Sequence, residues 1–209
     1  MISPQQSQSL DKVYCVDTGS DERMKCIAIQ SSPNTDGLTA GSAQAVLDGF
    51  EAEGGEVELL HLNQMDIRPC LACEEGWGNC RKGDCIQDDD LSLIRGKIAE
   101  ADVLVFATPV YWHDLSESAK RFLDRLRRTE TFSGRDTCVG TRAIGVAAAG
   151  GSGNGAARAL YNLEDYFKRL GLEIVDLVTL TKFSKDHKLP MLEQAGRRLA
   201  QGAPGVKTR

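Results

Sequence analysis

Residues 26–39 read Cys26-Ile-Ala-Ile-Gln-Ser-Ser-Pro-Asn-Thr-Asp-Gly-Leu-Thr39, and a helical pattern follows over residues 40–50. The stretch predicts a short apolar strand, a loop of small polar residues and then a helix. The unpaired N–H groups of a helix's first turn can bind an anion. Three hydroxyl groups, on Ser31, Ser32 and Thr39, can add hydrogen bonds to phosphate oxygens. The stretch therefore predicts a phosphate site, with an ordinary strand-to-helix connection as the alternative.

The loop lacks the two glycine-rich motifs that commonly bind nucleotide phosphates. It contains neither G-x-x-x-x-G-K-[ST], whose lysine contacts a nucleoside triphosphate, nor G-x-G-x-x-G, which binds a dinucleotide. The loop therefore suits a cofactor that carries a single phosphate.

Composition and charge argue against several classes of protein. A length of 209 residues suits one domain with a substantial core, and a hydrophobic content of 41% is typical of globular proteins. The net charge of −5 argues against a general nucleic-acid binder, which needs a positive face. No apolar run approaches the roughly 18 residues of a membrane span, and no basic-then-apolar export signal is visible. We therefore expect a cytoplasmic protein without a membrane span.

Strand and helix patterns alternate along the chain. Apolar strand patterns occur at residues 25–30, 57–62, 102–108, 142–149 and 174–180, and helical patterns occur at 40–50, 91–100, 114–126, 156–170 and 192–199. Strict alternation predicts right-handed βαβ units and a parallel sheet with helices on both faces. We expect a flavodoxin-like three-layer α/β/α sandwich with strand order 2-1-3-4-5. Residues 24–201 would form this domain, between an N-terminal extension (1–23) and a C-terminal tail (202–209).

Three loops converge at one edge of the predicted sheet. In this topology a ligand binds beyond the carboxyl ends of the strands, which here are followed by residues 31–39, 109–114 and 150–155. The second loop contains Pro109-Val-Tyr-Trp112, an apolar platform for a flat aromatic ring. The third is rich in glycine and has no bulky side chain to block such a ring. Each loop alone could be an ordinary turn, but together they predict a cofactor with a phosphate and a flat ring.

Several motifs carry a resemblance to a known family. They are Ser32-Pro-Asn34 through Thr39, Thr108-Pro-Val-Tyr-Trp112, Ser118-Ala-Lys120 with Phe122-Leu-Asp-Arg125, and Gly150-Gly151. Over residues 24–180 the chain resembles the NADPH-dependent FMN reductases and iron–sulfur flavoproteins. The resemblance implies non-covalent FMN, NAD(P)H as the electron donor, and a quinone, a metal or a small aromatic compound as the acceptor. It also points to homodimers or homotetramers, in which a second subunit completes the flavin pocket.

The resemblance further implies which residues hold the cofactor. The residues expected at the FMN phosphate are Ser32, Asn34, Leu38 and Thr39. The residues expected along the isoalloxazine ring and ribityl chain are Pro109, Val110, Tyr111, Trp112, Gly150 and Gly151. Members of the family often have a basic residue in place of Asn34 and a polar one in place of Leu38. Without that cation, backbone dipoles and hydroxyls would bind the phosphate. No catalytic acid or base is implied.

Four of the seven cysteines lie in the long polar connection of residues 63–90. They are Cys70, Cys73, Cys80 and Cys85, with the spacing C-x2-C-x6-C-x4-C. Such clustering indicates metal, cluster or redox chemistry in a protein that is not exported. The segment resembles the Cys-rich loop of iron–sulfur flavoproteins, whose spacing is more compact. Four thiolates could hold a [4Fe–4S] cluster or zinc, and free thiols or a redox pair are the alternative.

Two other functions therefore stay open. The chain could be an electron carrier in which FMN exchanges electrons with a cluster, or a redox- or zinc-responsive binding module that uses residues 70–85.

Charged residues near the predicted site have simpler interpretations. Asp114 and the run Asp88–Asp90 would cap the helices that follow them, and His113 would be a surface histidine near the flavin. The basic residues expected on a solvated helix face are Lys120, Arg121, Arg125, Arg127 and Arg128.

Overall fold

Five parallel strands form the central sheet of the computed structural model, which describes residues 23–76, 78–132 and 137–202. They are β1 (Lys25–Gln30), β2 (Glu56–His61), β3 (Val103–Tyr111), β5 (Arg142–Ala149) and β6 (Glu173–Thr181), in the order β2-β1-β3-β5-β6. Counted among the parallel strands alone, this is the predicted 2-1-3-4-5 order, so the flavodoxin-like fold is confirmed. A sixth, unpredicted strand, β4 (Asp114–Leu115), pairs antiparallel with the end of β3.

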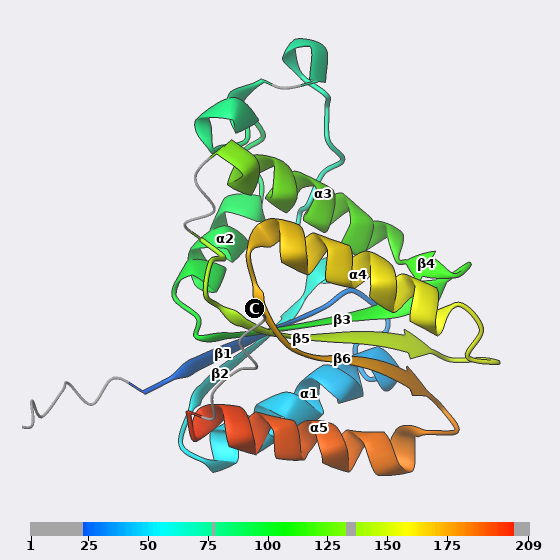
Figure 1. Cartoon of the computed structure of the whole chain (residues 1–209). Helices are drawn as coiled ribbons and strands as arrows, with labels where there is room; N and C mark the ends of the chain where they lie inside the picture. Colours follow the sequence, from blue (N-terminus) through cyan, green and yellow to red (C-terminus); the bar gives the residue numbers. More distant parts are fainter. Residues whose placement is uncertain (1–22, 77, 133–136, 203–209) are drawn as a thin grey trace, which may run out of the picture.

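Helices cover both faces of the sheet (Figure 1). On one face lie α1 (Leu38–Ala52) and α5 (Lys185–Ala200), and on the other lie α2 (Leu91–Ala99), α3 (Glu117–Phe132) and α4 (Ala156–Leu170). Successive strand side chains point to opposite faces, so Ile27 and Ile29 pack under α2, α3 and α4, whereas Cys26 and Ala28 pack under α1 and α5. Because both faces are covered, the inner strands β1, β3 and β5 are mostly apolar rather than alternating.

Two helices begin elsewhere than predicted. Asp114 belongs to β4, and the Oγ of Ser116 caps α3 by accepting the N–H of Ala119 at 3.2 Å. The prediction that Asp114 caps this helix is therefore wrong, because the chain first turns back along β3. Helix α5 begins at Lys185 rather than at residue 192, and Pro190 lies inside it.

The two helices α1 and α5 touch through glycine. A Cβ on Gly49 would lie 1.9 Å from the carbonyl oxygen of Glu193, and one on Gly196 would lie 2.0 Å from that of Val46. No residue larger than glycine fits at either position. This contact sets the two helices side by side, with the first turn of α5 close to the first turn of α1 (Figure 1).

The connection from β2 to α2 contains three short 3-10 turns, η1 (Leu62–Gln64), η2 (Glu74–Gly76) and η3 (Asn79–Lys82). It lies along α3, from which the guanidinium groups of Arg121, Arg125 and Arg128 donate hydrogen bonds to its backbone carbonyls.

Within the described parts of the chain, no helix has the length and apolar character needed to cross a membrane. The predicted N-terminal extension and C-terminal tail lie outside the described residues, except for Arg23 and Gly202.

Candidate functional site

The segment between β1 and α1 is held in place by the fully buried side chain of Gln30. The sequence alone did not assign this residue a role. Its amide donates to the carbonyl of Ser32 at 3.1 Å and accepts the N–H of Ser32 at 2.8 Å. It also bonds to Nδ1 of His61 at the end of β2, at 2.7 Å. At the other end of the segment, Gly37 offers no side-chain cap, so the first N–H groups of α1 have no side-chain acceptor at that position.

The three predicted phosphate hydroxyls have different surroundings. The Oγ of Ser31 donates to the carbonyl of Ala107 at 3.3 Å and accepts from the Oγ of Ser116 at 3.0 Å, so it bonds within the protein. The Oγ of Ser32 accepts the N–H of Asn34 at 3.1 Å but keeps its own proton to donate. Thr39 is only 4% exposed, and its hydroxyl has no hydrogen-bond partner among the residues that the structure describes. Ser32 and Thr39 therefore remain available to a ligand.

A network of hydroxyls joins this loop to the start of α3. The hydroxyls of Ser116 and Ser118 both donate to the carbonyl of Ser31, at 3.2 and 2.9 Å. The side-chain amide of Asn63 donates to the same carbonyl at 2.7 Å. This serine network fixes the β1–α1 loop relative to the segment that follows β3.

The segment Pro109–Trp112 ends in a tight hairpin rather than the predicted open loop. Tyr111 pairs with Asp114, which leaves Trp112 and His113 as a two-residue turn with φ of 48° and 68°. Two-residue hairpin turns require such positive φ, but Trp and His rarely adopt it. Strained turns of this kind concentrate at ligand sites. Pro109 is buried in β3, whereas Tyr111 is 41% and Trp112 is 97% exposed.

A cavity of about 260 Å³ separates this hairpin from the β5–α4 loop. It is lined by Val110, Trp112, His113 and residues 149–154. A Cβ on Gly150 or Gly151 would meet no atom within 4 Å, so the glycine wall is open toward a ligand. Gly155, with φ of 80°, lies so close to His113 that a Cβ would sit 2.5 Å from its Cα. The structure thus brings Val110, Trp112, Gly150 and Gly151 to one cavity at the carboxyl edge of the sheet.

A second cavity, of about 460 Å³, lies at the start of α1. It is lined by Asp36, Gly37, Leu38 and Gly41 from the first segment and by Lys182, Lys185 and Leu189 from the end of the chain. Of the four residues predicted at the phosphate, Leu38 lies in this lining, and Asn34 is exposed nearby, with its Oδ1 accepting the N–H of Asp36 at 3.3 Å. Sequence reasoning missed both lysines because they lie far from the loop in the chain.

The four clustered cysteines share one small cavity. Cys70, Cys73, Cys80 and Cys85 line a space of about 20 Å³, which holds about one water molecule. In the described part of the chain, no group of three or more His, Cys, Asp or Glu side chains is arranged to hold a metal ion. As arranged here, the four thiols do not fit a [4Fe–4S] cluster or zinc. Burial raises the pKa of Cys26 and that of Cys138, the latter to about 12, so these two thiols are unreactive.

Arg125 contradicts the prediction of a solvated basic face. Its side chain is 2% exposed, and its Nη1 and Nη2 donate to Oδ2 and Oδ1 of Asp89 at 2.5 and 3.1 Å. Nη2 also contacts Sγ of Cys85 at 3.2 Å. The signal was present in the sequence, because Arg125 lies one helical turn from both Phe122 and Thr129, which face the interior.

The acidic run before α2 also acts differently from the prediction. Burial alone would raise the pKa of Asp89, but hydrogen bonds from Arg125 and from the N–H groups of Arg68 and Leu91 hold that pKa below its ordinary value. Asp90 makes no side-chain cap, and its Oδ2 instead accepts the N–H of Asp66 at 2.7 Å. The run therefore fastens the cysteine connection more than it caps the helix.

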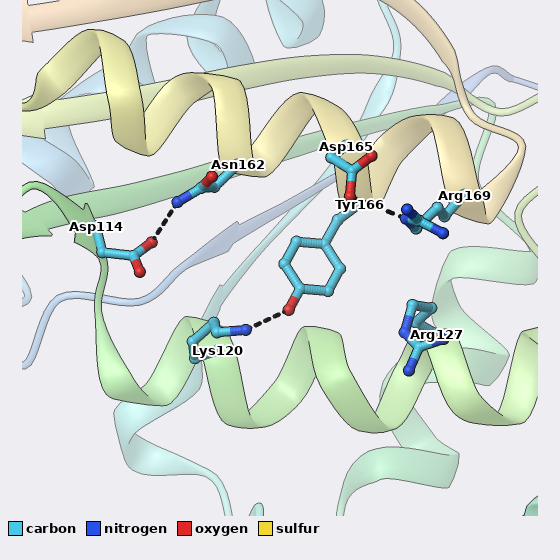
Figure 2. Close-up of a pocket in the computed structure, with 7 residues that line it drawn as sticks. All are labelled: Asp114, Lys120, Arg127, Asn162, Asp165, Tyr166 and Arg169. Atoms are coloured by element: carbon cyan, nitrogen blue, oxygen red, sulfur yellow. Dashed lines mark hydrogen bonds and ion pairs between the residues drawn. The ribbon is translucent and has the colours of Figure 1, made fainter.

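A charged groove of about 390 Å³ lies between α3 and α4, and Figure 2 shows its lining. Asn162 donates to Asp114 at 2.8 Å, Lys120 donates to the hydroxyl of Tyr166 at 2.6 Å, and Arg169 pairs with Asp165 at 2.9 Å (Figure 2). The Tyr166 hydroxyl donates in turn to Asp124 at 2.5 Å. Because most of its polar groups bond to one another, this groove is better explained as a bridge between the two helices than as a ligand site.

Comparison with protein families gives a match over most of the chain. The profile of a family described as NADPH-dependent FMN reductase matches residues 24–183. An iron–sulfur flavoprotein of Archaeoglobus fulgidus is 34% identical over 104 residues, which are 49% of this chain and 46% of that protein. Another, from Methanosarcina thermophila, is 29% identical over 155 residues, or 73% and 77% of the two chains. The alignment to the Archaeoglobus protein thus spans about half of its length.

Solved structures agree on the fold. An NAD(P)H:quinone oxidoreductase from Methanothermobacter marburgensis superposes with a TM-score of 0.68 at 20% identity, over 85% of this chain and 98% of that one. An apo NADH:FMN oxidoreductase superposes with a TM-score of 0.63 at 20% identity, over 88% and 91%. At these identities the likeness establishes the flavodoxin-like fold.

Proposed function

Since the chain belongs to the NADPH-dependent FMN reductase family, we propose that it passes electrons from NAD(P)H through FMN to a quinone or another small aromatic acceptor. Family membership makes the chain an oxidoreductase whose cofactor is FMN and whose reductant is NAD(P)H. Family membership does not identify the electron acceptor, so the acceptor is our own proposal.

The residues at the carboxyl edge fit FMN. The isoalloxazine ring would occupy the cavity that is lined by Trp112 on one side and by the backbone of Gly150 and Gly151 on the other. The phosphate has the uncapped start of α1 and two available hydroxyls, those of Ser32 and Thr39. When bound, FMN supplies a ring nitrogen that accepts hydride and a ring system that releases electrons one or two at a time.

In this proposal the protein itself binds FMN and orients it. The serine network and Gln30 hold the phosphate loop, while the Trp112–His113 turn and Gly155 hold the ring wall. We assign no catalytic acid or base, because NAD(P)H supplies the hydride and the second hydrogen of the hydroquinone can come from water as a proton. The single observation that carries the acceptor proposal is the open ring cavity beside Trp112, where a flat molecule can stack.

The test is a reconstitution in the absence of air. Purified protein is titrated with FMN, mixed with NADPH or NADH, and then mixed with a benzoquinone while the visible flavin spectrum is followed. We expect FMN to bind, to bleach with the nicotinamide and to recover its colour with the quinone. A protein that leaves FMN free, or holds FMN that neither nicotinamide bleaches, would overturn the proposal. Bleached flavin that the quinone does not reoxidise would overturn the acceptor assignment alone.

An electron carrier with an iron–sulfur cluster is the second candidate. It is favoured by the four cysteines around one cavity and by relatives named iron–sulfur flavoproteins. That cavity would have to open to admit a cluster. Iron and acid-labile sulfide in protein purified without air would support this candidate, whereas iron-free protein that turns over NADPH would exclude it. We also propose that the protein is cytoplasmic. The cysteines of the described residues are free thiols, and thiols stay reduced in the cytoplasm.

A further inference from the structure

The sulfur of Cys85 lies against a buried guanidinium group. Nη2 of Arg125 is 3.2 Å from Sγ of Cys85, and the side chain of Arg125 is only 2% exposed. The buried carboxylate of Asp89 accepts hydrogen bonds from both Nη1 and Nη2, which fixes the guanidinium in this place. Cys85 itself is half-buried, so solvent reaches part of it. This thiol therefore differs from an ordinary surface cysteine, because a fixed cation lies beside its sulfur.

One donor of the same guanidinium is unused. Within the described chain, Nε of Arg125 is buried and has no hydrogen-bond partner. A buried donor without a partner is costly, and it often marks a bound water or a site of chemistry. Arg125 and Cys85 both line the cavity of about 20 Å³, which holds about one water molecule. The cavity therefore has room for one polar atom, such as an oxygen, bonded to the sulfur.

Three more thiols border this cavity. They belong to Cys70, Cys73 and Cys80. A Cβ on Gly78 would lie 2.6 Å from Sγ of Cys73, so this sulfur packs on the backbone just before Cys80. All four cysteines of the cavity are free thiols. A sulfur oxidised at Cys85 therefore has neighbours with which it can form a disulfide.

We propose that Cys85 is a site of reversible oxidation by hydroperoxides. In the first step its Sγ attacks one oxygen of the hydroperoxide, the O–O bond breaks, and a sulfenic acid forms. The thiol proton leaves with the other oxygen, as water or as an alcohol, so sulfur loses two electrons and the peroxide gains them. The oxygen now on sulfur enters the cavity and accepts a hydrogen bond from Arg125. The same guanidinium stabilises the charge that develops on the peroxide oxygens.

In the second step a neighbouring thiol of the cavity displaces the oxygen. Its sulfur attacks Sγ of Cys85, the S–O bond breaks, and water leaves as the disulfide forms. This step needs no further oxidant, and an added thiol reductant reverses it by exchange. The whole reaction uses neither flavin nor nicotinamide, so it does not depend on the proposed function.

The experiment compares two cysteines of the same protein. The full-length chain is treated with hydrogen peroxide and dimedone, which traps sulfenic acids, and each cysteine is followed by mass spectrometry. Exposure alone would favour Cys70, the exposed thiol of the cavity. We expect Cys85 to react about tenfold faster than Cys70, the effect of one charge-assisted hydrogen bond. In urea the two rates should become equal, because the unfolded chain no longer holds Arg125 beside the sulfur.

Without dimedone, disulfide mapping should find Cys85 paired with another thiol of the cavity. Cys85→Ser should abolish this disulfide. Cys70→Ser is the matched control, and it should leave the dimedone adduct at Cys85 unchanged. Arg125→Gln should lower the rate at Cys85 to that at Cys70, provided that circular dichroism shows a folded protein. If this variant does not fold, the comparison between native and urea-unfolded protein still decides.

Three results would overturn the inference. They are oxidation that begins at Cys70, equal rates at Cys70 and Cys85 in the folded protein, and iron bound by the four cysteines after purification without air. A protein that fails to bind FMN would overturn the oxidoreductase proposal and leave the peroxide result unchanged.

Discussion

We propose that the side chain of Trp112 serves a ligand rather than the fold. It is 97% exposed on a turn whose φ of 48° suits few residues of its size. Such a side chain contributes little to folding, so its most direct use is to cover one face of a bound ring.

We therefore expect Trp112→Ala to weaken FMN and riboflavin equally, by about three- to tenfold, the usual range for one aromatic stacking contact. The melting temperature should stay the same. The measurement is a fluorescence titration beside Tyr161→Ala, which removes an aromatic side chain of α4 that is 70% exposed. Unchanged flavin binding in Trp112→Ala would remove this residue from the site.

Asp89 and Arg125 form the buried ion pair that fastens the cysteine connection to α3. Asp89→Asn leaves a buried guanidinium without its counter-charge, and we expect it to lower the free energy of unfolding by about 3–5 kcal/mol. Asp88→Asn is the control, because Asp88 is exposed. Urea unfolding of both variants makes the comparison, and equal stability of the two would contradict the role given to Asp89.

The same pair makes stability depend on pH. The folded pKa of Asp89 is lowered, so its contribution is complete above the unfolded pKa of about 3.9 and is lost as pH falls through the folded value. Unfolding measured from neutral pH downward should show the unmodified protein losing this contribution in acid. Asp89→Asn has no such contribution to lose, so its deficit should shrink there. A constant deficit at every pH would contradict the assignment.

At the scale of elements, the packing of α1 on α5 depends on two glycines. Gly196→Ala would place a Cβ 2.0 Å from the carbonyl oxygen of Val46. We expect it to destabilise the protein by about 1–3 kcal/mol, as overpacked cores do. The control, Gly96→Ala on α2, meets no atom within 4 Å and should stabilise by roughly 0.5–1 kcal/mol. Thermal unfolding of the two variants should therefore shift in opposite directions.

Elements with a clear local pattern were predictable, whereas those that depend on distant partners were not. The strand predicted at residues 25–30 agrees with β1, and the helix predicted at residues 156–170 agrees with α4, because apolar spacing alone specifies them. β4 is only two residues long, too short for a periodic pattern. Arg125 appeared solvated because its partner, Asp89, lies in a separate element. Lys182 lines the cavity at the start of α1 although it lies far from that helix in the chain.

At the scale of the whole molecule, the carboxyl edge of the sheet exposes large aromatic side chains. Trp112 is 97% and Phe183 is 93% exposed, which is unusual for groups of this size unless something covers them. We expect a second copy of the chain to cover this edge and to form a homodimer or homotetramer. Light scattering of the FMN-loaded protein measures the mass directly, and a monomer at all concentrations would contradict this expectation.

The hydroxyls of Ser116 and Ser118, bonded to the carbonyl of Ser31, link the two cofactor loops inside the protein. The conformational entropy of ordering these loops is therefore lost when the chain folds and not when FMN arrives. Calorimetry of FMN binding should show a small negative heat-capacity change, set by the ring surface that becomes buried. The large negative heat-capacity change that accompanies coupled folding and binding should be absent. On our proposal, the protein therefore has the shape that the flavin requires before the flavin binds.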